Sequence, residues 1–272
     1  IATVSAKAMA AAAKSTPFRE LGPQAARAAR AKQFMATHRE YFGTDGPPPS
    51  RRDLTISHPS SSEPVAVSIF EPSSGATPRG VYLHAHGGSW IFGAASYQND
   101  IRLTKMADAL NIAIVSVDYR LCPESKWPAP VDDCVAAACW LVEEAEAQFG
   151  PQVLNRLVIG GESAGGHLIV SAMLRLRTAL SLPPSAPFPY RAANLVYGVY
   201  DLDMTPSART YGDRPLVLNT RDLEWAVSML LPSPLPPGAD GAPLTRRSPE
   251  LSPLYAPPEA LRAMPPALFT GA

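Results

Sequence analysis

The chain contains 272 residues, of which 46% are hydrophobic and 18% are charged. This composition supports one large domain with a buried core and excludes a disordered chain or a coiled coil. Lysine plus arginine and aspartate plus glutamate number 24 each, so the formal net charge is zero. Because a basic surface is the usual mark of a protein that binds nucleic acid or an anionic membrane, we expect neither partner.

Cysteine usage and hydropathy point to a reducing compartment. Cys122, Cys134 and Cys139 form no disulfide framework and no C-x-x-C pair. No apolar run reaches the length of about 18 residues that a transmembrane helix needs, so we expect no integral membrane segment. We expect a cytoplasmic protein. Residues 1–19 contain three basic and no acidic side chains, which leaves organelle targeting open as an alternative.

The N-terminal part predicts a helix followed by two strands. Residues 25–41 combine good helix formers with apolar residues at near-helical spacing, and the segment Gly43-Thr44-Asp45-Gly46 closes this helix. Two short β-type runs follow at residues 53–58 and 65–70. The serines between the two runs are typical of a turn, so we expect a hairpin.

From residue 80 the chain alternates strands, glycine-rich turns and helices. Apolar strands alternating with helices favour a mostly parallel sheet covered on both faces, so the predicted fold class is α/β. The predicted strands cover residues 80–86, 112–119, 156–160, 194–200 and 267–271, and the predicted helices cover residues 101–110, 131–148 and 164–180.

The connection between the last two predicted strands is much longer than an ordinary crossover. It runs from Asp201 to Pro266 and contains a helix prediction at residues 221–231. We interpret it as an insertion that covers the carboxyl edge of the sheet, where open α/β sheets bind their ligands.

The sharpest motif is Gly161-Glu162-Ser163-Ala164-Gly165, which lies directly after a predicted strand and directly before a predicted helix. A nucleophile elbow requires this context, and its tight turn requires minimal side chains two residues before and two after the nucleophile. Both of these positions are glycine. We therefore predict that Ser163 is a catalytic nucleophile, exposed above the sheet at the positive end of the next helix. A glycine-rich turn with a solvent-facing serine is the alternative.

A second motif, His86-Gly87-Gly88-Ser89-Trp90, ends the predicted strand at residues 80–86. Acyl transfer to a serine needs N–H donors aimed at the oxyanion, and glycines let the backbone approach the substrate. We predict an oxyanion hole made by the amides of Gly87, Gly88 and Ala164. A tight turn that only closes the strand is the alternative, and the presence of both motifs favours catalysis.

Three ordered blocks carry a resemblance to a known family. They are His86-Gly87-Gly88-Ser89-Trp90, Asp118-Tyr119-Arg120-Leu121-Cys122-Pro123-Glu124 and Gly161-Glu162-Ser163-Ala164-Gly165-Gly166. Together they resemble the hormone-sensitive lipase family of α/β-hydrolase esterases over roughly residues 50–272. The resemblance implies an eight-stranded, mostly parallel sheet with a helical cap. It also implies hydrolysis of small carboxylic esters through an acyl-enzyme, without a metal or an organic cofactor.

The same resemblance divides the chain. It implies N-terminal cap helices in residues 1–46 and a hydrolase core in residues 47–272, with a cap or lid insertion at about residues 202–250. The family usually has a third glycine where this chain has Ser89. Because the two glycine donors before it are in place, we expect only a local adjustment of the loop.

The acid and the base of the triad are the main departure from the family. The resemblance places the acid after the strand at residues 267–271 and the histidine further downstream, so we expect both to lie beyond residue 272. The C-terminal part of the fold is then missing, and we expect this chain alone to be nearly inactive. None of the five histidines has the position of the base: His38, His58, His84, His86 and His167.

Other residues of the motifs receive supporting roles. His86, Gly161, Glu162 and Gly165 are expected to orient the two motifs. Trp90 follows the oxyanion glycines and is a candidate for lining the acyl pocket.

Two weaker alternatives remain for chemistry elsewhere. His84 and His86 have metal-ligand spacing on a strand, but no further ligand cluster accompanies them, so we expect no metal. Asp201 and Asp203 follow a predicted strand, as the triad acid does in some other α/β hydrolases. A structural role for these two aspartates is the preferred interpretation.

The sequence thus predicts a carboxylic-ester hydrolase with a small-molecule ester as its substrate. Since a fold does not determine function, two alternatives stay open. One is a non-catalytic small-molecule receptor on the same fold, and the other is an amidase or formamidase. A homodimer also stays open.

Overall fold

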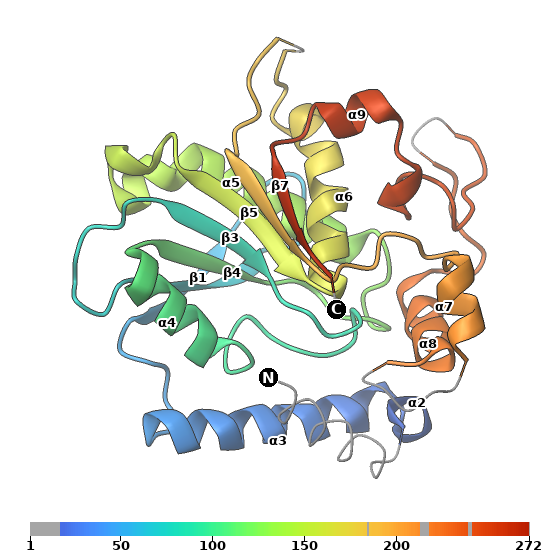
Figure 1. Cartoon of the computed structure of the whole chain (residues 1–272), viewed down its shortest axis with the longest axis horizontal. Coiled ribbons are helices and arrows are strands. Elements are labelled where there is room, and N and C mark those ends of the chain that lie inside the picture. Colours follow the sequence, from blue (N-terminus) through green and yellow to red (C-terminus); the bar gives the residue numbers. More distant parts are fainter. Residues whose placement is uncertain (1–16, 184, 213–217, 239–240, 272) are drawn as a thin grey trace.

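The computed structural model describes residues 17–183, 185–212, 218–238 and 241–271 (Figure 1). Residues 1–16 therefore lie outside the described residues. They contain most of the basic stretch at residues 1–19 and the first part of the N-terminal cap predicted for residues 1–46. Within the described ranges, no helix is both long and apolar enough to cross a lipid bilayer.

Seven strands of the described residues form one sheet in the order β1-β2-β4-β3-β5-β6-β7. β2 pairs antiparallel with β1 and with β4, and the other neighbours pair in parallel. The mostly parallel sheet is thus confirmed, with seven strands where the resemblance implies eight. The strands are β1 (Arg51–Ile56), β2 (Val65–Phe70), β3 (Val81–Ala85), β4 (Ala113–Asp118), β5 (Leu157–Glu162), β6 (Ala192–Val196) and β7 (Ala267–Thr270).

Helices cover both faces of the sheet (Figure 1). Successive side chains of a strand point to opposite faces. In β3, Leu83 belongs to the main core cluster with buried residues of α5 (Ala129–Phe149) and α6 (Ala164–Ala179). Tyr82 instead packs in a second cluster with Leu103 of α4 (Asp100–Leu110). The α/β class predicted from the alternation of strands and helices is confirmed.

Several predicted boundaries were wrong by a few residues. β6 ends at Val196, whereas the sequence predicted a strand over residues 194–200. Tyr197 adopts a φ of 37°, which breaks the extended backbone. α5 begins at Ala129, earlier than predicted, because a proline such as Pro130 is compatible with the first turn of a helix.

The remaining helices lie before the sheet and in the long connection after β6. Of these, the sequence predicted α3 and α8 but none of the shorter ones. The ion pair of Arg19 with Asp222 joins the N-terminal helices to the insertion. The helices are α2 (Phe18–Leu21), α3 (Pro23–Phe42), α7 (Pro206–Tyr211), α8 (Thr220–Leu230) and α9 (Pro258–Arg262), and the 3-10 turns are Pro151–Val153 and Pro253–Tyr255.

α3 contacts the segments that follow β3 and β4. Arg27 of α3 donates to the backbone carbonyl of Ile91 and to that of Cys122, each at 2.9 Å. Its guanidinium also pairs with Glu124 at 2.9 Å. The N-terminal helix is therefore fastened at the carboxyl end of the parallel strands, where the predicted catalytic motifs also lie.

Candidate active site

Ser163 occupies the turn between β5 and α6. Its φ of 54° is a left-handed conformation, which costs about 1–3 kcal/mol for a residue with a side chain and is concentrated at functional turns. The Ser163 amide donates to the carbonyl of Val196 at 2.9 Å, and its carbonyl accepts from the His167 amide at 3.2 Å. The strand, the turn and the helix that the motif predicted are all present, and Ser163 is half-buried in the turn.

The glycines of the elbow permit its close packing against β3. A Cβ atom built on Gly165 would lie 2.1 Å from the carbonyl oxygen of Ala85 and 2.5 Å from that of His86. A Cβ atom on Gly161 would lie 2.6 Å from the same oxygen of Ala85. Because all of these contacts are with backbone atoms, only glycine fits at either position.

The loop after β3 lies beside the elbow. A Cβ atom on Gly87 would lie 3.3 Å from the Cβ of Ser163. Among the described residues, neither the Gly87 amide nor the Gly88 amide donates a hydrogen bond to the chain. Ala164 is the first residue of α6, so its amide has no acceptor within the helix. The fold thus brings the serine and the glycine motif together, with N–H groups of both loops free.

The backbone of this loop is strained over three consecutive residues. Gly88, Ser89 and Trp90 have φ values of 140°, 53° and 60°. At Gly88 a Cβ atom would lie 2.1 Å from the carbonyl oxygen of Phe92, which excludes any other residue. Ser89, where the family usually has a third glycine, adopts a left-handed conformation that glycine would adopt at no steric cost.

Trp90 differs from its predicted place at an acyl pocket. Its side chain is fully buried, and its indole Nε1 donates to Nδ1 of His167 at 3.1 Å. Its carbonyl accepts from the Cys122 amide at 2.9 Å. Trp90 therefore packs behind the loop, held between α6 and the segment after β4.

Glu162 is buried next to the nucleophile and accepts hydrogen bonds from three side chains. His84 Nε2 lies 2.7 Å from one carboxylate oxygen, and the other accepts from Asn99 Nδ2 at 3.0 Å and Arg102 Nη2 at 3.1 Å. Burial opposes the charge of Glu162, but His84 and Arg102 outweigh this effect and lower its pKa to about 2.

The two strand histidines, His84 and His86, have different hydrogen-bond partners. His84 bonds Ser116 Oγ at 3.0 Å on its other ring nitrogen. His86 stacks on the ring of Tyr119 at a centroid distance of 4.2 Å, and its Nδ1 bonds the carbonyl of Gly87 at 2.9 Å. The two imidazoles therefore serve different partners, and no group of three potential metal ligands gathers in the described part of the chain.

Stability should depend on pH through Glu162. A carboxylate whose folded pKa is lowered contributes stability above its unfolded pKa, which is near 4.5, and loses it as the pH falls toward 2. The shift corresponds to about 3 kcal/mol in full. We expect Glu162→Gln to flatten the fall in unfolding free energy between pH 5 and 3, measured by urea denaturation. Glu146→Gln, at an exposed position of α5, is the control and should show the same pH dependence of the unfolding free energy as wild type. An equal flattening in this control would contradict the role of Glu162 in the pH dependence.

None of the five histidine side chains hydrogen-bonds Ser163. All five lie in the described residues, and each one engages partners other than Ser163. Asp201 is also engaged, because its carboxylate accepts from the Asp203 amide at 2.9 Å and from the Tyr255 hydroxyl at 3.2 Å. The structure thus places Ser163 beside the glycine loop, and within the described residues no histidine side chain hydrogen-bonds it.

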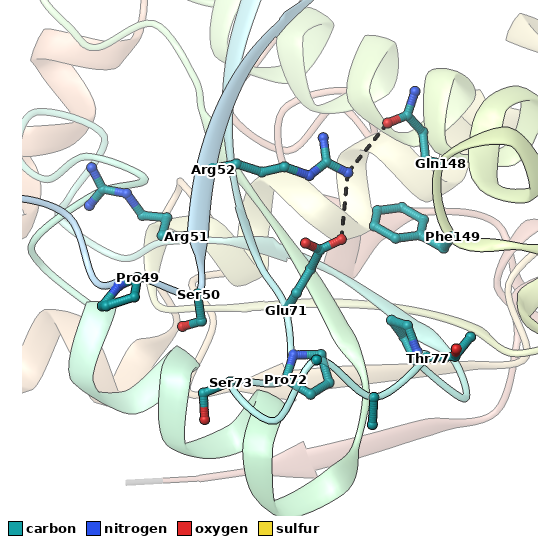
Figure 2. A pocket seen from close by; sticks show the side chains of 13 residues that line it. Pro49, Ser50, Arg51, Arg52, Glu71, Pro72, Ser73, Thr77, Gln148 and Phe149 are labelled. Carbon is teal, nitrogen blue, oxygen red and sulfur yellow. Dashed lines mark hydrogen bonds and ion pairs between the residues drawn. The ribbon is translucent and has the colours of Figure 1, made fainter.

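A cavity of about 450 Å³ lies away from this site (Figure 2). It is bounded by the start of β1, the end of β2 and the end of α5. Arg52 lies within it, 3.7 Å from Glu71 and 3.4 Å from Gln148. Phe70 at the end of β2 pairs with Ile114 near the start of β4. The cavity therefore lies at the amino end of the parallel strands, whereas Ser163 follows the carboxyl end of β5. No motif of the sequence predicted it.

Known proteins resemble this chain in sequence and in structure. The family profile Abhydrolase_3, described as alpha/beta hydrolase fold, matches residues 82–272. "Carboxylic ester hydrolase LipN" of Mycobacterium tuberculosis is 33% identical over 80% of this chain and 53% of its own length. "Hormone-sensitive lipase" of Mus musculus is 31% identical over 38% of this chain and 13% of its own length.

A solved structure shows the same fold. The ester-hydrolase EH1AB1 from the metagenome of Lake Arreo, in complex with a derivative of bipyridine phosphonate, has a TM-score of 0.76 at 21% identity. The alignment covers 97% of this chain and 77% of that one. The chain spans between about half and two thirds of the length of the curated relatives that match most of it.

Proposed function

This chain belongs to the α/β-hydrolase family that includes hormone-sensitive lipase, and on that basis we propose that it carries the nucleophile and the oxyanion donors of a carboxylic-ester hydrolase for small esters. The observation that supports this most is the contact between the two motifs. Gly87 and Ser163 are neighbours, with the Cβ position of the glycine 3.3 Å from the Cβ of the serine. The carbonyl group of one ester substrate can then contact both the Ser163 hydroxyl and the amides of the glycine loop.

The reaction follows from this arrangement. The Ser163 hydroxyl attacks the ester carbonyl carbon and gives its proton to a base. The amides of Gly87, Gly88 and Ala164 stabilise the negative oxygen of the tetrahedral intermediate, and the N-terminus of α6 adds its positive dipole end. The intermediate collapses, the alcohol leaves with the proton, and water hydrolyses the acyl-serine in a second step of the same kind.

Among the described residues, no histidine side chain hydrogen-bonds Ser163. The five histidines are engaged elsewhere, and the resemblance places the triad histidine and acid after residue 272. A serine without its base loses most of its rate, because the weakly acidic hydroxyl is not deprotonated in the attack. We therefore expect the 272-residue chain alone to be nearly inactive toward esters.

We also propose that the N-terminal helices and the insertion form a cap that limits the size of the substrate. Phe92, which follows the oxyanion glycines, lies between the two. Its ring centroid is 5.0 Å from that of Phe18 in α2 and 6.4 Å from that of Trp225 in α8. Aromatic side chains packed beside the donors leave little room for a long acyl chain, which favours small esters.

Binding without turnover is the alternative that a specific observation favours. Since no described histidine side chain hydrogen-bonds Ser163, the same groups would serve a small-molecule receptor. An amidase or formamidase would use the same groups as the esterase and differs only in the preferred leaving group.

The test uses the full-length gene product that carries these residues. We expect a fluorophosphonate probe to form one adduct, on Ser163, and Ser163→Ala to lower p-nitrophenyl butyrate hydrolysis by at least about 10³-fold. Ser74→Ala, at an exposed serine of the opposite sheet edge, is the matched control. Equal hydrolysis by Ser163→Ala, or an adduct elsewhere, would overturn the assignment. Neither an adduct nor ester or amide turnover from the folded protein would favour a receptor, and faster turnover of amides than of esters would identify an amidase.

A further inference from the structure

The strained oxyanion loop needs contacts that hold it. Gly88, Ser89 and Trp90 all have left-handed φ values, and two of them carry side chains. Such conformations persist only where the surrounding structure determines them. Because the amides of this loop are the proposed oxyanion donors, the contacts that maintain it also maintain the site.

Trp90 is the residue of the loop with the most extensive anchoring. Its side chain is fully buried, and its indole Nε1 donates to His167 Nδ1 at 3.1 Å. The two rings meet edge to face, with centroids 5.3 Å apart and an interplanar angle of 88°. The Trp90 carbonyl accepts from the Cys122 amide at 2.9 Å. A buried indole N–H that lost its acceptor would be left without a partner, which is costly.

His167 links this anchor to the insertion. It lies in the first turn of α6, and its Nε2 is 2.9 Å from the carbonyl of Leu251. A carbonyl only accepts and an indole only donates, so the imidazole carries its proton on Nε2 and leaves Nδ1 free. Complete burial lowers the pKa of His167 to about 4, so the ring is neutral at physiological pH. Both ring nitrogens are therefore used in one defined tautomer.

We propose that His167 is a positioning residue of the hydrolase site: its imidazole, oriented by Leu251 of the insertion, holds Trp90 and so keeps the oxyanion loop in place beside Ser163. The inference rests on the proposed function and adds a role for the insertion. Through Leu251 and His167, the insertion is connected by hydrogen bonds to the loop that binds the oxyanion, in addition to limiting substrate size.

Two substitutions separate the two hydrogen bonds of His167. Asparagine places its side-chain oxygen near the position of Nδ1, so His167→Asn keeps an acceptor for Trp90 and loses the donor to Leu251. Glutamine places its amide nitrogen near Nε2, so His167→Gln keeps the donor and leaves the Trp90 indole without an acceptor. A histidine that only filled space in the core would be affected similarly by both changes.

The experiment measures p-nitrophenyl butyrate hydrolysis by the full-length gene product. We expect His167→Gln to lower kcat about 30-fold to 100-fold with KM within about threefold of wild type, since a displaced donor weakens the transition state more than the ground state. We expect His167→Asn to lower kcat by about threefold to fivefold, because it keeps the acceptor for Trp90 but loses the orienting bond to Leu251. Trp90→Phe should lower kcat about as much as His167→Gln does. The variant that combines the two substitutions should have a kcat no more than about threefold below that of either single variant. His58→Gln, whose ring nitrogen accepts from Ser60, is the control and should match wild type.

A second measurement does not need activity. Hydrogen exchange of the Trp90 indole N–H, followed by NMR, should be slow in wild type and in His167→Asn, and at least about 10-fold faster in His167→Gln. Wild-type kcat in His167→Gln, or equal losses in the Asn and Gln variants, would overturn the inference. If His167→Gln does not fold, Trp90→Phe tests the same bond through kcat. If wild type neither reacts with the fluorophosphonate nor turns over esters, the proposed function fails, and the exchange rates still decide whether His167 anchors Trp90.

Discussion

Gly165→Ala is expected to lower kcat/KM toward p-nitrophenyl butyrate by at least about 10³-fold in the full-length gene product. The new methyl group would lie 2.1 Å from the Ala85 carbonyl oxygen and 2.5 Å from that of His86. Both are backbone atoms, so α6 must move away from β3. Ser163 precedes α6 and moves with it, and a displacement of about 1 Å at a reacting group costs on the order of 10²-fold. The same movement separates Ala164 from the glycine loop, which removes an oxyanion donor at a further cost of about 10²-fold to 10³-fold.

Gly46→Ala is the matched control for this substitution. The only atom within 4 Å of a Cβ at Gly46 is Thr44 Oγ1 at 3.5 Å, which is an ordinary contact. The control should retain wild-type kcat/KM and melting temperature. Activity of Gly165→Ala within tenfold of wild type would show that the elbow does not pack against β3 as described.

Asp100→Ala is expected to lower the free energy of unfolding by about 3–5 kcal/mol. The Asp100 carboxylate is fully buried and lies 2.6 Å from Nη1 of Arg51, whose side chain is 3% exposed. Burial raises the pKa of Asp100, and Arg51 opposes this rise only in part, so the intact pair contributes little net stability. The large loss on substitution comes from Arg51, which would remain charged and buried without its nearer carboxylate partner and would keep only Asp53, at 3.2 Å from Nη2.

This loss should also loosen the N-terminal helix. His38 of α3 lies 3.3 Å from the same carboxylate, so Asp100 joins α3 to β1 and α4. Urea denaturation of the 272-residue chain measures the effect. Asp45→Ala removes the partner of Arg39 in an exposed ion pair of 2.7 Å, and because solvent screens this pair it should leave the free energy of unfolding close to that of wild type. Similar losses in the two variants would contradict the special role of the buried pair.

The class of the fold, and the proximity of the two glycine motifs, could be predicted from the residues. Strand and helix leave local periodicities of apolar residues, so the alternation after residue 80 was sufficient for a mostly parallel sheet. The strand-to-helix turn at Ser163 and the glycine loop after β3 could be predicted because their geometry demands glycine at short, regular spacing. Gly88, Gly161 and Gly165 each face backbone atoms at distances that exclude a side chain.

The ends of the elements were less predictable because pairing determines them. The run at residues 194–200 is mostly apolar, yet the strand stops at Val196, where the ladders with β5 and β7 both end. The short helices α2, α7 and α9 have four to six residues each, too few for a helical period to emerge from the sequence.

What holds the site together had no signature along the chain. Trp90 and His167 are 77 positions apart, and His167 and Leu251 are 84 positions apart. Arg27 reaches Ile91 across 64 positions. A motif expresses constraints between residues that are adjacent in sequence, and those constraints selected Ser163 and the glycines. Contacts between distant segments exist only once the sheet has closed and buried these polar groups, because only then must each find its partner.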